Sequence, residues 1–208
     1  MTPDIHGEAL RTAEWFRGID RGIYLAAGTP APQLLRVPEK DAQQLLRETA
    51  RAVADAPKET NGDVVWVAGA DELLVRPAVV GLTCAAGLVT VSLPVGCDQL
   101  RDGGTVEVPF AVGTDEAPAG LVMSTLDRPI GPAVVVDGWA GALTAFAWES
   151  LVALASALSA AAGRDSAGAP LIPGYLGAER GLLLIQPMAR HKPVTARFVR
   201  PSTVVRLR

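Results

Sequence analysis

The stretch Gly138–Gly163, "GWAGALTAFAWESLVALASALSAAAG", decides how this chain can fold. From Ala140 to Ala162 it has one charged residue, Glu149, and a helix of that length would span roughly 35 Å, enough to cross a bilayer. Glu149 would then lie near the bilayer midplane, and ten of the 23 residues are alanine, so the apolar drive is weak. Strand patterns also flank both ends. We therefore expect a long buried core helix at about residues 138–163 and no membrane span.

The two faces of this helix differ in side-chain size. One wide stripe belongs against a sheet and contains Leu143, Phe146, Ala147, Ser150, Leu151, Leu154 and Leu158. The opposite face is small and nearly uncharged, whereas a solvated face normally carries Lys, Glu or Arg. Two covers are possible for it: the N-terminal helices of the same chain, or the same helix of a second subunit. The residues that would form this contact are Ala142, Ala145, Ala153 and Ser156.

Between Asp63 and Asp137 the apolar residues recur with a period of two, which is typical of antiparallel strands with one buried face. "LVTVSLPV" and "TVEVPFAV" are two such strands, and the turn-rich "GCDQLRDGG" between them predicts a hairpin. In the second strand Glu107 should face solvent, while the core should receive Val106, Val108, Phe110 and Val112. Further strands are expected at Val64–Val67, Leu73–Val75, Ala78–Thr83 and Leu121–Leu126.

The residues on either side of the long helix predict a crossover connection. "AVVVD" (Ala133–Asp137) has the pattern of a short buried strand, and Asp137 is a suitable N-cap for the helix. "IPGYLGAERG" after the helix resembles a connection, and "LLLIQPM" predicts a second buried strand. Strand, helix and strand in this order predict a βαβ unit with roughly parallel strands. "VTARFV" and "TVVRL" predict strands near the C-terminus.

The N-terminal part of the chain predicts helices. Residues 1–36 are expected to be irregular, with a short helix in "GEALRTAEWFRGI". "DAQQLLRETARAVADA" (Asp41–Ala56) is an amphipathic helix pattern with Asp41 as N-cap. We expect an N-terminal helical segment at residues 1–60 and an α+β core at 61–208, forming one compact domain. The fold class is α+β, with a mixed, mainly antiparallel sheet packed against one long Ala-rich helix.

Charge and cysteine content limit the partners and the compartment. The formal charge is −3, yet residues 190–208 contain six basic and no acidic residues. Such a segment could contact phosphates, but a pI of about 5.4 disfavours nucleic acid, and Arg197 suits the outer face of an edge strand. No basic stretch followed by an apolar run marks a secretory signal. Cys84 and Cys97 are expected to be reduced thiols, and the Arg-, Ala- and Gly-rich composition suggests a bacterial cytoplasmic protein.

The sequence contains no catalytic motif: no nucleophile elbow, phosphate-binding loop or dinucleotide motif occurs. Two Cys and two His are too scattered for a zinc site, so we expect no metal and no cofactor. The leading hypothesis is a non-catalytic protein that acts through self-association or protein–protein interaction. The alternative is an enzyme or small-molecule-binding protein with a pocket between helix and sheet. Residues for that pocket are Trp148, Glu149, Arg190 and His191.

Overall fold

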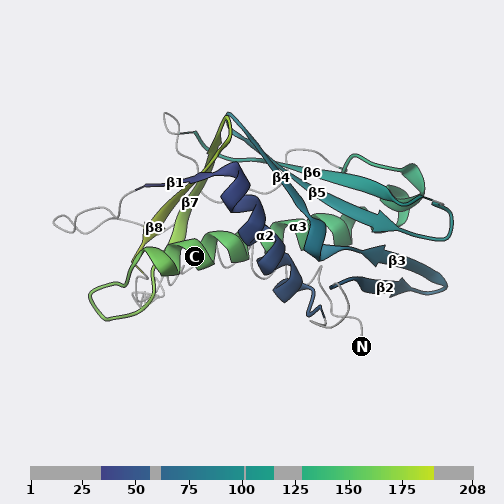
Figure 1. The fold of residues 1–208 in the computed structure, drawn as a ribbon, viewed down its shortest axis with the longest axis horizontal. Helices are drawn as coiled ribbons and strands as arrows, with labels where there is room; N and C mark the ends of the chain where they lie inside the picture. Colours follow the sequence, from purple (N-terminus) through teal and green to yellow (C-terminus); the bar gives the residue numbers. More distant parts are fainter. Residues whose placement is uncertain (1–33, 57–61, 101, 115–127, 190–208) are drawn as a thin grey trace, which may run out of the picture.

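The chain folds as two antiparallel sheets that share one long helix (Figure 1). The computed structural model describes residues 34–56, 62–100, 102–114 and 128–189. The elements are β1 (Leu35–Pro38), α2 (Glu39–Val53), β2 (Val64–Ala68), β3 (Asp71–Val75), the 3-10 helix η1 (Pro77–Val79), β4 (Gly81–Ala85), β5 (Leu88–Gly96), β6 (Gly104–Ala111), α3 (Ala133–Ala162), β7 (Ile172–Glu179) and β8 (Leu182–Met188). The fold is α+β, as the sequence predicts.

The larger sheet is built around β5. The order is β2-β3-β5-β4, and β6 also pairs with β5. β4 pairs with β5 as far as Ser92, and β3 pairs with it from Val95. Pro94 lies between these two partners, and its carbonyl accepts a hydrogen bond from the Arg76 N–H at 3.1 Å. The missing N–H of Pro94 therefore faces the junction where pairing changes from one strand to the other.

The smaller sheet has the order β1-β8-β7 and is joined to the larger one through Gly113. The Gly113 N–H donates to the Leu176 carbonyl at 3.1 Å, and the Ala178 N–H donates to the Gly113 carbonyl at 2.9 Å. A side chain at Gly177 would collide with Tyr175 and with the Gly113 carbonyl, so this close approach requires a glycine. The two sheets are therefore linked through backbone hydrogen bonds, and both pack against α3.

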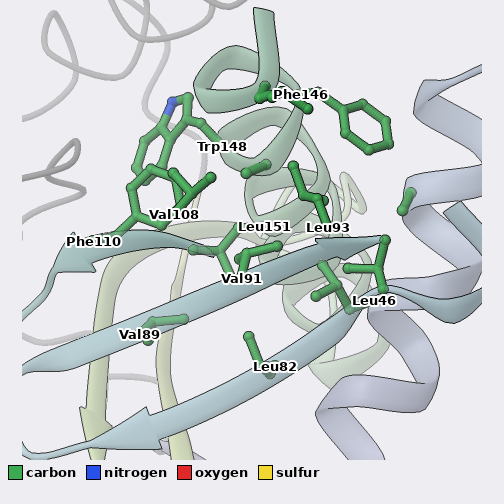
Figure 2. Packing of buried hydrophobic residues seen from close by; sticks show 14 of the residues in the cluster. Leu46, Leu82, Val89, Val91, Leu93, Val108, Phe110, Phe146, Trp148 and Leu151 are labelled. Atoms are coloured by element: carbon green, nitrogen blue, oxygen red, sulfur yellow. The ribbon is translucent and has the colours of Figure 1, made fainter. Parts of the chain in front are cut away.

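One apolar core fills the space between the sheets, α2 and α3. Trp148 of α3 lies against Phe110 of β6, with ring centroids 5.5 Å apart (Figure 2). The buried stripe of α2 consists of Ala42, Leu46 and Ala50. The Thr49 hydroxyl of α2 also donates to the Ser150 carbonyl of α3 at 3.2 Å. The large-residue stripe predicted for α3 is buried as expected, except that Leu158 is half-buried.

The predicted hairpin is confirmed. β5 and β6 pair antiparallel over eight residues, from Leu88↔Ala111 to Val95↔Gly104. Glu107 is exposed, and the predicted inward-facing residues Val106, Val108, Phe110 and Val112 are buried.

The predicted strand at Ala133–Asp137 is wrong, because these residues form the first turns of α3. A short apolar run fits a buried strand and a buried helix equally well. Pro132 precedes the helix and needs no hydrogen-bond partner for its nitrogen. Asp137 is consequently not an N-cap; it lies exposed in the second turn and forms an ion pair with Arg128.

The predicted βαβ crossover is also wrong. Residues 172–179, expected to be a connection, form β7, which pairs antiparallel with β8. The strand was not predicted because it contains Pro173 and Gly174, and both residue types are uncommon inside strands. They coincide with a shift of register between Pro173 and Tyr175, where a side chain at Gly174 would collide with Met188.

Smaller differences concern the N-terminal half. α2 begins at Glu39 rather than at Asp41, which lies in the first helical turn, so the predicted N-cap is wrong. β1 was not predicted, and the expected strand at Ala78–Thr83 begins only at Gly81, after η1. The helix expected before residue 20 and the strands expected at Leu121–Leu126, 194–199 and 203–207 lie outside the described residues.

Candidate functional site

Strand β2 lies at the end of the larger sheet, and among the described residues only β3 pairs with it. Its sequence, "VVWVA", has no charge. Trp66 is 4% exposed and packs on Phe146 and Trp139, with ring centroids 5.5 and 6.3 Å away. Val65 and Val67 point the other way and are 51% and 47% exposed. Trp66 thus anchors one face of β2, while two valines remain open to solvent.

Other strand edges in the described fold are blocked. At β4, the Cys84 N–H donates to the Glu39 carboxylate at 2.7 Å, and the Gly181 N–H donates to the Cys84 carbonyl at 3.1 Å. At β6, Glu107 and Ile130 exchange two backbone hydrogen bonds of 2.7 and 2.9 Å. Blocking of this kind prevents sheets from adding strands of other chains.

The outer edges of β6, β7 and β1 are protected in other ways. β6 contains Pro109, whose nitrogen cannot donate. Gly113 occupies the outer edge of β7. β1 has four residues and ends at Pro38, and short strands with proline are poor templates for pairing. In the described part of the chain, β2 therefore combines an open edge with exposed apolar side chains.

A hollow of about 410 Å³ opens beside Val65 on the outer face of the larger sheet. Val65, Leu74 and Leu100 give it an apolar floor, and the half-buried Cys97 lines it as well. Val65 and Leu74 are cross-strand partners in β2 and β3. The hollow and the open edge of β2 therefore share one surface.

The described rim of the hollow is acidic. Glu72, Asp98 and Asp102 line it, together with one basic residue, Arg76. The guanidinium of Arg76 lies 3.8 Å from a carboxylate oxygen of Asp63, so its charge is partly neutralised. Such a rim favours a cationic partner.

The residues predicted for a pocket between helix and sheet do not gather around this hollow. Trp148 is 1% exposed and belongs to the core against Phe110. Glu149 is half-buried on α3, and neither residue lines the hollow. Arg190 and His191 lie outside the described residues.

The small-residue face of α3 is partly covered within the chain. Ala145 is 3% exposed, and Ala142, Ala153 and Ser156 are half-buried. α2 packs against α3, and the hydrogen bond between the two helices joins Thr49 to Ser150 of the large-residue stripe. Contact of this face with a second subunit stays a prediction.

β2 could not be identified as an edge strand from its residues, because pairing order cannot be derived from strand patterns. The usable signal was local. Four of five residues in "VVWVA" are large and apolar, so the strand has no polar face to turn toward water.

Both cysteines are free thiols, and they differ in exposure. Burial and, to a lesser extent, the nearby Glu39 carboxylate raise the pKa of the Cys84 thiol from 9.0 to about 12. Since the thiolate is the reactive form, Cys84 is inert at neutral pH. Cys97, which lines the hollow, is the more accessible of the two.

By length and composition α3 could cross a membrane, and 56% of its most apolar window is buried inside the fold. Burial of that extent is typical of a core helix. Within the described ranges, no group of three or more His, Cys, Asp or Glu residues is arranged to hold a metal ion.

No family model matches the chain, and neither the curated proteins nor the solved structures contain a significant match to it. The geometry of the β2 edge is therefore the basis for a functional proposal.

Proposed function

We propose that this protein is non-catalytic and acts by self-association, in which a polypeptide strand of a second copy adds to the open edge of β2. The observation that carries the proposal is the exposure of Val65 and Val67, at 51% and 47%, on a strand that pairs with β3 alone in the described part of the chain.

Strand addition uses two features that β2 provides. Unpaired backbone groups supply hydrogen bonds, and exposed alternate side chains supply contacts that select the partner. An uncharged, apolar edge is an aggregation hazard unless something covers it. In the same molecule, other groups of the chain form hydrogen bonds with the outer edges of β4, β6 and β7, so these edges are closed to a further strand.

The proposal can be tested by sedimentation velocity over a range of concentrations, combined with amide hydrogen exchange. We expect the mass to rise with concentration and the amides of residues 64–68 to become protected as it does. Val67→Lys places a charge on the edge and should abolish both effects. Val79→Lys is the matched control, because Val79 is 52% exposed and belongs to η1 rather than to β2.

Two results would contradict the proposal. One is a monomer at every concentration, with β2 amides that exchange freely. The other is an association that Val67→Lys and Val79→Lys weaken equally, since the contact would then not depend on the β2 edge.

A further inference from the structure

We infer that the strand added to β2 is residues 194–199, "VTARFV", of a second copy of the chain. This inference rests on the proposed function and names the occupant of the edge. Residues 190–208 lie outside the described part of the structure, so the argument uses their sequence and the described surface.

Charge complementarity is the first support. Residues 190–208 contain six basic residues and no acidic residue. The described rim of the hollow beside β2 contains Glu72, Asp98 and Asp102, with Arg76 engaged by Asp63. Opposite charges steer partners together and select against other segments.

The pattern of side chains is the second support. In an extended "VTARFV", Phe198 and Arg197 point to opposite faces. A strand beside β2 can continue the inner face of Trp66 with Phe198 and the outer face of Val67 with Arg197. Glu72 is the cross-strand partner of Val67 on β3, so its backbone would lie about 10 Å from the added strand. The side chains of Arg197 and Glu72 together span such a gap.

The position of β8 indicates that a second copy supplies the strand. β8 ends at Met188, and five residues separate it from Val194, a connection that reaches about 20 Å at most. Figure 1 shows β8 and β2 at opposite ends of the long axis, with α3 extending between them. Trp66 of β2 packs on Phe146 of α3, and the part of α3 from Phe146 to its end at Ala162 is about 24 Å long. Because this length exceeds the reach of the connection after β8, we assign the added strand to a second copy.

Cross-linking of the full chain tests the occupant directly. Cys97 lines the hollow, and Cys84 is buried and inert. In Thr195→Cys, a flexible bismaleimide should link the new thiol to Cys97 of another molecule and give covalent dimers on a denaturing gel. Adding Cys97→Ser, or Val67→Lys, should abolish these dimers.

An exchange of charges between two residues tests the same contact without a cross-linking reagent. Arg197→Glu and Glu72→Lys should each weaken association by about tenfold. An equimolar mixture of the two variants should associate more strongly than either alone, because both of its mixed interfaces pair opposite charges, whereas each variant alone pairs like charges.

Failure of the proposed occupant and failure of the proposed function give different results. If the protein associates and protects β2, but Thr195→Cys gives no dimer through Cys97, this occupant is wrong and the proposed function stands. A cross-link within one molecule, or a mixture no stronger than its components, would also overturn the second-copy arrangement. A protein that does not associate overturns both.

Discussion

The carboxylate of Glu39 accepts a hydrogen bond from the backbone N–H of Cys84 at 2.7 Å, in the place where a neighbouring strand would offer a carbonyl. The Gly181 N–H completes the substitution by donating to the Cys84 carbonyl, and the Glu39 N–H donates to the Gly181 carbonyl at 2.9 Å. Three residues thereby tie α2, β4 and the β7–β8 turn together.

Removing this carboxylate should destabilise the fold. Glu39→Ala leaves the partly buried Cys84 N–H without its acceptor, and we expect a loss of about 1–3 kcal/mol in the free energy of unfolding. Glu39→Gln keeps an acceptor oxygen and should lose less. Urea denaturation measures both, with Glu48→Ala on the exposed side of α2 as control. Equal stability of Glu39→Ala and Glu48→Ala would show that the contact is dispensable.

The buried thiol should make the stability fall at alkaline pH. The native state keeps the Cys84 proton up to about pH 12, whereas the unfolded chain releases it near pH 9.0. The native state therefore binds more protons in this window, and the free energy of unfolding decreases as pH rises through it. Denaturation curves at several pH values should show a shallower decrease for Cys84→Ala than for the wild type. Identical slopes would mean that Cys84 titrates normally.

Ala153→Arg tests the cover of the small-residue face of α3. Ala153 is half-buried within the chain, and a bulky charged side chain should reduce stability by about 1–3 kcal/mol without a change of mass. Thermal melting with sedimentation separates this result from a contact with a second subunit, in which the protein stays folded but its mass falls. Unchanged melting and unchanged mass would show that neither cover exists.

Asp137→Ala should have little effect, in contrast to the loss expected of an N-cap. Asp137 and Arg128 are both exposed, and such ion pairs contribute about 0–1 kcal/mol. Alanine also favours the helix interior more than aspartate does. We expect a change within about 0.5 kcal/mol by urea denaturation. A loss above about 1 kcal/mol would mean that Asp137 still acts as a cap.

Single helices and strands could be predicted from the sequence, whereas the pairing of the strands could not. Alternation in β6 correctly placed Glu107 outside and Phe110 inside, because a slip by one residue would expose the whole apolar set. The Ala-rich helix α3 was predicted from the stripe of large apolar residues along one of its faces. The prediction of a strand at Ala133–Asp137 was wrong because a short apolar run has no period that separates strand from helix. Strand β7 was missed because it contains Pro173 and Gly174, which lie at its irregular pairing with β8.

The candidate site depended on sheet order, which no local pattern contains. Val65 and Val67 are ordinary strand valines by sequence; they matter because β2 is the end strand of the larger sheet among the described residues. Trp148 illustrates the opposite error. A large aromatic residue beside Glu149 suggested a pocket, and the structure uses it to fill the core against Phe110.

The pairing of β1 with β8 joins Leu35 to Ile185, near the two ends of the described chain. Contacts this distant along the sequence form late, because a long loop must close before they stabilise anything. On the ribosome, β1 leaves the exit tunnel long before β8 is synthesised, and its pairing edge has to wait for almost the whole protein. The smaller sheet therefore forms only when translation has delivered β8.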